Sequence, residues 1–172
     1  SIIHVLNLNL NKIQKKLVYF KIPEGRGDIK IIKKFNKKFK FIDESYNANP
    51  LSMMSAINNM SYYDKNKKYR KFALLGDMLD LGRKSKKFHK ELSTTINKSD
   101  IDKVFVYGKY IRGTFDNLFI SKKGKVFKNL NEAHNHFGKI LRNNDLLMVK
   151  GSNATGLNQF SKNIKRRQIG AL

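Results

Sequence analysis

The sequence predicts an α/β fold in which a mostly parallel, doubly wound sheet is covered by helices on both faces. Short apolar runs alternate along the chain with longer segments that have the periodicity of helices. Parallel strands need long crossover connections, and these helical segments have the necessary length. With 172 residues, of which 40% are hydrophobic, the chain is long enough to bury a core of its own.

The expected elements follow from the chain in order. Residues 1–20 have apolar side chains at helical spacing, with a break near Asn9, and the turn 22–27 (IPEGRG) then ends the helix and marks a hinge. The segments on either side of Asn36 could form an antiparallel hairpin at the start of the sheet. The alternation then runs strand 39–43, helix 50–64, strand 71–75, helix 85–98, strand 103–107, helix 109–119, strand 125–128, helix 130–142, strand 146–149 and helix 157–167.

The charge of the chain leaves two interpretations open. The 36 Lys and Arg residues against 13 Asp and Glu give a net charge of +23, which favours a basic module that binds nucleic acid or another polyanion. However, the basic residues recur from Lys12 to Arg167 without gathering on one segment, and they accompany abundant Asn and Ile, as a drift in composition with solvated lysines would give. No RNA-binding signature occurs in the sequence.

Several classes of protein are excluded. The chain has no cysteine, which excludes a disulfide framework, a thiolate metal site and a cysteine nucleophile. No apolar run has the length of a membrane span, and the first residues do not resemble a signal peptide. We therefore expect a cytoplasmic protein without a membrane partner.

Stretches rich in Asp, Asn, Ser and Gly follow three of the expected strands. They are DESYNANP (43–50), GDMLDLG (76–82) and KGSN (150–153), whereas the turns at the opposite edge are rich in lysine. In an open parallel sheet, ligands bind beyond the carboxyl ends of the strands. The sequence therefore predicts a site at one edge of the sheet.

The first stretch has both a structural and a functional interpretation. Asn49 is a good N-cap and Pro50 suits the first turn of a helix. That interpretation leaves Asp43, Glu44 and Tyr46 without a role. Adjacent carboxylates beside a helix N-terminus suit a hydroxyl-rich ligand such as ribose, or a magnesium ion.

The other two stretches are less specific. The 76–82 stretch is either a glycine-bounded loop or a surface that presents acidic and apolar side chains together. In the 150–153 stretch, a lysine and small residues precede a helix, where backbone N–H groups favour an anion. Neither G-x-G-x-x-G nor G-x-x-x-x-G-K-[ST] occurs, so the chain lacks an NTP-hydrolysing loop of its own. The four histidines do not pair as ligands, and we expect each to be satisfied or exposed.

Taken together, DESYNANPLSM, LGDMLDLG and VKGS, in this order and at these separations, resemble the carboxy-terminal domain of the Mur ligase family, in the branch that adds D-alanyl-D-alanine to UDP-N-acetylmuramoyl-tripeptide. The amino end, LNLNKIQKKLVYFKIPEGRG, resembles the last helices of that family's central ATPase domain and the following link. The resemblance implies that residues 1–24 are the tail of the central domain and the link, and that residues 25–172 are a Rossmann-like ligase domain.

The resemblance also implies an activity. It is that of an ATP-dependent carboxylate–amine ligase of peptidoglycan precursor synthesis, which works through an acyl phosphate. ATP and Mg²⁺ are the implied cofactors, with the phosphate-binding loop and the metal ligands in upstream amino-terminal and central domains. We therefore expect no metal site in this chain, no activity of the chain alone, and a monomer. Binding of nucleic acid is then the alternative.

The resemblance assigns residues to two sets, without naming a catalytic residue. Arg26 matches an interdomain arginine that reaches the nucleotide, and Asp43 and Glu44 match an acidic pair at its ribose. Asn153 stands where the family often has arginine. The implied nucleotide-binding set is Arg26, Asp43, Glu44, Tyr46, Asn47 and Asn49, and the implied substrate-binding set is Asp77, Met78, Lys150, Gly151 and Ser152.

Overall fold

The computed structural model describes residues 9–17, 19, 23–63 and 69–166. Its centre is a six-stranded sheet in the order β1-β2-β6-β3-β4-β5, in which only β1 and β2 pair antiparallel. The mostly parallel sheet predicted from the sequence is therefore confirmed. The strands are β1 (Asp28–Lys34), β2 (Lys37–Glu44), β3 (Lys71–Gly76), β4 (Lys103–Tyr107), β5 (Lys123–Val126) and β6 (Leu146–Lys150).

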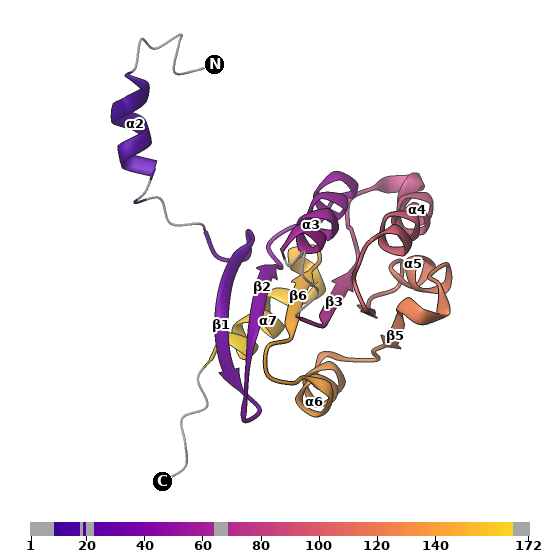
Figure 1. Ribbon diagram of the computed structural model, residues 1–172. Helices are drawn as coiled ribbons and strands as arrows, with labels where there is room; N and C mark the ends of the chain where they lie inside the picture. The colour runs from indigo at the N-terminus through magenta and orange to yellow at the C-terminus, as the bar shows by residue number, and fades with distance from the viewer. Residues whose placement is uncertain (1–8, 18, 20–22, 64–68, 167–172) are drawn as a thin grey trace.

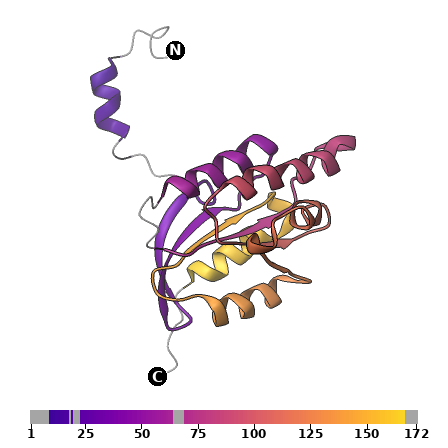
Figure 2. The same cartoon turned by 45° about the vertical axis from the view of Figure 1, so that its right-hand side comes forward.

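Helices cover both faces of the sheet (Figures 1 and 2). Side chains of α3 and α4 join one hydrophobic cluster, to which the α5 segment also contributes, and side chains of α6 and α7 join a second cluster on the opposite face. The strands β3 and β6 are buried along their whole length because both faces are covered. The described α-helices are α2 (Leu10–Leu17), α3 (Pro50–Tyr62), α4 (Ser85–Lys98), α5 (Arg112–Asp116), α6 (Leu130–Ile140) and α7 (Leu157–Lys165).

The helix α5 is shorter than the predicted helix 109–119. At its start, the backbone N–H groups of residues 109–111 donate to the Asp77 carboxylate from a different loop. After its end, Asn97 of α4 accepts from Phe119 N and donates to Asn117 O. Side chains distant in the sequence thus hold both ends, and periodicity alone does not reveal them.

The expected hairpin joins β1 to β2. Lys34 pairs with Lys37, so the turn consists of Phe35 and Asn36, both with φ of 55°. Positive φ at both central residues matches the twist of a two-residue hairpin, and asparagine tolerates it well. The Phe35 ring packs against the His134 ring, with centroids 4.9 Å apart, which helps to hold this turn.

The amino-terminal part of the described chain is a short helix. Asn9 caps α2, because its Oδ1 accepts from the N–H groups of Asn11 and Lys12 at 3.0 and 3.2 Å. A helix start therefore lies at the break expected near Asn9, whereas the expected helix before it lies outside the described residues. Figure 1 shows α2 apart from the sheet. None of the described helices is long and apolar enough to cross a bilayer.

Candidate functional site

The sheet topology brings the three predicted stretches together. The strand β6 lies between β2 and β3, and all three run parallel. Glu44 at the end of β2 is in register with Lys150 at the end of β6, which in turn is in register with Leu75 of β3. The loops that follow these strands therefore meet at the carboxyl edge of the sheet, which is where parallel sheets bind ligands.

Lys150 links two of the stretches. Its side chain is 2% exposed, and Nζ donates to Asn47 O at 2.9 Å and to Glu44 Oε2 at 3.3 Å. Burial lowers the pKa of Lys150, and the Glu44 carboxylate only partly offsets that effect. A buried cation at the end of β6 thus holds the turn after β2.

The Asp43 side chain is held by Ser45 of its own turn and by Lys165 of α7. Its Oδ1 accepts from the N–H and the hydroxyl of Ser45 at 3.1 and 2.6 Å, and its Oδ2 pairs with Lys165 Nζ of α7 at 2.8 Å. Burial opposes ionisation, but these hydrogen bonds and the charge of Lys165 outweigh it and lower the pKa of Asp43. Both oxygens have protein partners, so a contact with a nucleotide stays a prediction. No motif in the sequence points to Lys165 as a partner of Asp43.

The link before β1 is fastened to the same turn. Gly27 N donates to Asp43 O at 2.7 Å, and Tyr46 N donates to Gly25 O at 3.1 Å. The Arg26 guanidinium lies 4.1 Å from the centre of the Tyr46 ring, in the geometry of a cation–π pair. A Cβ at Gly27, where φ is +90°, would come within 2.8 Å of Glu44 Oε1, so this position favours glycine.

These contacts place the Arg26 guanidinium against the Tyr46 ring and the Glu44 carboxylate against Gly27. As a whole residue Tyr46 is 48% exposed, and the Glu44 side chain is 25% exposed. The two asparagines of the stretch have local partners instead. Asn49 caps α3 through a reciprocal pair of hydrogen bonds with Ser52, and Asn47 Oδ1 accepts from Ala48 N at 2.7 Å. Their predicted roles in nucleotide binding are untested.

The loop after β3 is held by its own first residue. The Asp77 carboxylate accepts from the backbone N–H groups of Lys109, Tyr110 and Ile111 at 2.9, 2.9 and 2.7 Å. The Met78 side chain is 1% exposed and belongs to the core. The structure thus gives both residues structural contacts, and the predicted contacts with a substrate stay predictions.

The stretch after β6 packs against this loop. Ser152 N donates to Asp77 O at 3.0 Å, and Ser152 Oγ accepts from Leu79 N at 3.0 Å. Gly151 lies so close to its neighbours that a Cβ would be 2.7 Å from Leu157 Cδ1. Gly151 and Ser152 therefore bring the loops after β3 and β6 into contact, and their predicted role in substrate binding is likewise untested.

His89 of α4 also reaches the loop after β3. Its Nε2 lies 2.9 Å from Met78 N, its Nδ1 lies 2.7 Å from Ser85 O, and the residue is fully buried. We expected His89 to be either hydrogen-bonded or exposed, and the structure shows that it is hydrogen-bonded. The link to Met78 is not apparent from the sequence, because a lone histidine on a helix carries no motif.

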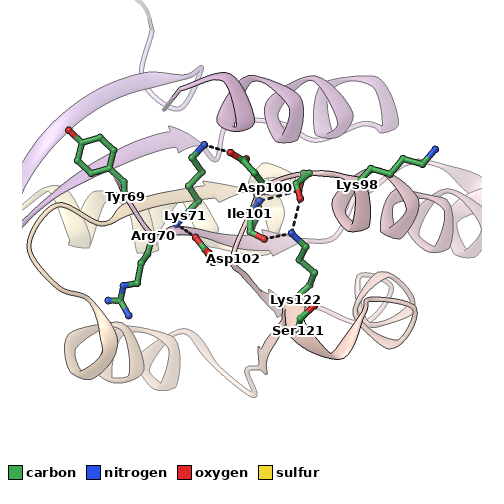
Figure 3. Close-up of a pocket in the computed structure, with 10 residues that line it drawn as sticks. Tyr69, Arg70, Lys71, Lys98, Asp100, Ile101, Asp102, Ser121 and Lys122 are labelled. Atoms are coloured by element: carbon green, nitrogen blue, oxygen red, sulfur yellow. Dashed lines mark hydrogen bonds and ion pairs between the residues drawn. The ribbon is translucent and has the colours of Figure 1, made fainter. Parts of the chain in front are cut away.

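The amino edge of the sheet contains a cavity of about 560 Å³ that the sequence did not predict (Figure 3). Lys71 Nζ pairs with Asp100 at 2.5 Å, and Lys71 N donates to Asp102 at 2.7 Å. Lys122 Nζ donates to the carbonyls of Ser99 and Ile101, each at 2.7 Å. These contacts hold the turn before β4 to the start of β3, so Lys71 and Lys122 have structural partners.

The described part of the chain offers no cluster of side chains that would hold a divalent cation by itself. Among the described residues, no three side chains of His, Cys, Asp or Glu group as ligands. At the carboxyl edge, the carboxylates of Asp43 and Asp77 already accept hydrogen bonds or pair with Lys165. The arrangement suits a ligand that offers hydroxyl groups, an aromatic ring or negative charge more than a bare metal ion.

Comparisons with known proteins identify relatives. The family described as "Mur ligase, glutamate ligase domain" matches residues 29–153. The UDP-N-acetylmuramoyl-tripeptide–D-alanyl-D-alanine ligase of Rickettsia prowazekii is 31% identical over 159 residues, which are 92% of this chain and 34% of that protein. The ligase of the same name from Buchnera aphidicola subsp. Baizongia pistaciae is 33% identical over 141 residues, 79% of this chain and 28% of that protein.

Solved structures show the same fold. The MurF ligase from Thermotoga maritima in complex with ADP superposes with a TM-score of 0.75 at 21% identity, covering 95% of this chain and 35% of that one. MurF from Acinetobacter baumannii gives a TM-score of 0.76 at 20% identity, covering 96% and 35%. The chain thus spans about a third of the length of these relatives. With the family match over most of its length, the chain belongs to the Mur ligase family, in the part that corresponds to the glutamate ligase domain.

Proposed function

We propose that this chain is the carboxy-terminal part of an ATP-dependent ligase that joins D-alanyl-D-alanine to UDP-N-acetylmuramoyl-tripeptide. The observation that carries the proposal is the meeting of the loops after β2, β6 and β3 at one edge of the sheet. The relatives from Rickettsia and Buchnera bear the name of this activity and support it at 31% and 33% identity.

The loop after β2 forms the nucleotide side of the proposed site. Arg26 supplies positive charge, Tyr46 supplies a half-exposed ring, and the Glu44 carboxylate can accept hydrogen bonds from ribose hydroxyls. Asp43, Asn47 and Asn49 belong to the same subsite and shape its turn through the contacts described above. The ADP named with the Thermotoga structure supports a nucleotide ligand.

The loops after β6 and β3 form the substrate side. In the proposed reaction, a terminal carboxylate oxygen of the tripeptide attacks the γ-phosphorus of ATP, and the bond from that phosphorus to the bridging oxygen breaks and releases ADP. The amine nitrogen of D-alanyl-D-alanine then attacks the acyl carbon. The bond from that carbon to the phosphate oxygen breaks, and the nitrogen loses a proton. Lys150 places a positive charge between the two sides, while Asp77, Met78, Gly151 and Ser152 shape the surface toward the substrates.

The rest of the proposed ligase lies outside this chain. Magnesium would neutralise phosphate charge when bound, and its ligands belong to upstream domains in this proposal, because the described residues offer no such group. The phosphate-binding loop is absent from the sequence as well. We assign residues 1–24 to the tail of the central domain and the link, and residues 25–172 to the ligase domain of a monomeric cytoplasmic enzyme.

The alternative of a polyanion-binding module is not favoured. Several lysines donate to backbone carbonyls, as Lys37 does to Gly138 O at 3.0 Å and Lys103 does to Lys123 O at 3.1 Å. Some of the lysines that make up the +23 charge therefore make hydrogen bonds that stabilise the fold. The relatives with known names are ligases.

The proposal is tested with the longer ligase, obtained by joining the chain to the two upstream domains. Phosphate release should require the UDP-linked tripeptide, D-alanyl-D-alanine and ATP together, and the product should have the mass of the joined peptide. The 172-residue chain alone should release no phosphate. ATP hydrolysis by the chain alone that Lys150→Ala abolishes would contradict the proposal, since the chain would then hold a complete site.

A further inference from the structure

His89 is a buried group that the proposed reaction does not use. It lies on α4, is fully buried, and contacts the loop after β3 through the ring nitrogen Nε2. Its backbone carbonyl accepts from the Thr114 hydroxyl, and its ring lies 5.8 Å from that of Tyr110. His89 therefore joins three segments: α4, the loop after β3, and the segment that Asp77 caps.

The partners of the ring define one tautomer. Met78 N–H can only donate, so Nε2 must accept this hydrogen bond at 2.9 Å. Ser85 O can only accept, so Nδ1 must carry the proton in the 2.7 Å contact. This geometry requires a neutral imidazole with its proton on Nδ1, since a cation would present N–H groups to both partners.

The same loop is held at neighbouring points from β6. Ser152 contacts Asp77 O and Leu79 N, so these bonds and that of His89 fix three consecutive residues of the backbone. Directly afterwards Asp80 is exposed and has φ of 61°, in the left-handed region. The position of the Asp80 carboxylate therefore depends on the backbone at Met78, to which His89 is hydrogen-bonded.

We propose that His89 is a positioning residue for the amine substrate: as the neutral Nδ1–H tautomer it holds Met78, and through it the loop that carries Asp80, at the substrate side of the site. The inference rests on the proposed ligase function. The strand β6 separates this loop from the turn after β2. His89 should therefore influence binding of the dipeptide and leave binding of ATP unchanged.

Two substitutions in the longer ligase separate positioning from general stability. In His89→Gln, Oε1 can take the place of Nε2 and accept from Met78 N–H, whereas the bond to Ser85 O is lost; in His89→Leu, Met78 N–H stays buried without an acceptor. Both variants should lose stability. The leucine variant should lose about tenfold or more in kcat/KM for D-alanyl-D-alanine with the KM for ATP unchanged, and the glutamine variant should recover most of it.

The matched control is His136→Leu, on α6 at the other face of the sheet, which should leave both KM values unchanged. Equal losses in the Gln and Leu variants, or an equal rise in both KM values, would overturn the positioning role while the ligase function stands. A ligase without activity toward the three substrates would overturn the proposed function, and the role in substrate positioning with it.

The tautomer is tested independently of activity. In the ¹⁵N-histidine-labelled 172-residue chain, the imidazole shifts of His89 should show a protonated Nδ1 and an unprotonated Nε2. The Met78 amide should exchange slowly with solvent, and faster in His89→Leu than in His89→Gln. A protonated Nε2, or equal exchange in the two variants, would overturn the positioning role of His89 even in an active ligase.

Discussion

The two edges of the sheet both contain a buried lysine paired with a partly exposed acid, yet they differ in the groups that lie beside that pair. At the amino edge, Lys71 pairs with Asp100 in the turn before β4. Hydrogen bonds from Lys71 N and from Lys122 hold the same turn. At the carboxyl edge, the buried Lys150 and Asp43 hold the turn after β2, while Glu44 and Tyr46 of that turn remain partly exposed. The Asp100 side chain is 29% exposed and that of Glu44 is 25% exposed, so a buried lysine with a partly exposed acid does not by itself mark a site. The carboxyl edge adds the exposed Arg26 and the half-exposed Tyr46 ring.

The largest effect should come from removing the Asp77 carboxylate. Asp77→Ala leaves three backbone N–H groups without their acceptor, and the free energy of unfolding should fall by about 3 kcal/mol or more. Urea denaturation of the 172-residue chain measures it. Asp116→Ala, at the end of α5, is a control that should change stability little. A loss of less than about 1 kcal/mol would show that Asp77 is not the anchor of this loop.

The next largest effect is expected from substitution of Glu44 at the carboxyl edge, and it is measured as a change in the kinetics with ATP. In the longer ligase, Glu44→Ala should lower kcat/KM for ATP by about ten- to a hundredfold, because a hydrogen bond to a charged group contributes roughly 1.5–3 kcal/mol. Glu44→Gln keeps part of the hydrogen bonding and should lose less. Unchanged kinetics together with a lowered thermal midpoint would make this turn purely structural.

A smaller effect is expected at the amino edge. Lys71→Met leaves Asp100, whose side chain is 29% exposed, able to take up water, so the free energy of unfolding should fall by only about 1–2 kcal/mol. The kinetic constants of the longer ligase should not change. A rise in the KM for ATP would contradict the separation of the two edges and would give the cavity in Figure 3 a role in the reaction.

The smallest effect concerns pH. The pKa of Asp43 lies below its ordinary value of 3.8, so its contribution to stability is present above that pH and is lost as the pH falls through the lower pKa of the folded state. Burial opposes the charge of Lys165, but Asp43 and nearby acids outweigh it and raise its pKa above 10.5. The contribution of Lys165 is therefore present below that pH and is lost as the pH rises through the higher folded pKa.

Thermal midpoints should be measured as a function of pH, from below the ordinary pKa of Asp43 to above that of Lys165. At both the acidic and the basic end, the midpoint should decline less in the double variant Asp43→Asn/Lys165→Met than in the parent chain. Lys162→Met, one turn earlier on the same helix, is the matched control and should leave both ends unchanged. Identical profiles for the parent chain and the double variant would contradict the pairing of Asp43 with Lys165.

The sequence could predict the sheet and the edge that carries the candidate site, because crossover connections force the carboxyl ends of parallel strands to one side. It could not predict which residues of the motifs face inward. Asp77 and Met78 have the composition of a ligand loop, but the carboxylate caps a distant segment and the thioether is in the core. Lys165 and His89 act through contacts distant in the chain, which no local spacing encodes.

Hydrogen–deuterium exchange of the longer ligase, with and without a non-hydrolysable ATP analogue, tests most directly whether the carboxyl edge is the site. When the analogue is bound, exchange should slow in residues 43–50 and in the link around Arg26, and it should stay unchanged in residues 98–102 at the amino edge. Protection of residues 98–102, or no protection of 43–50 at saturating analogue, would contradict this prediction.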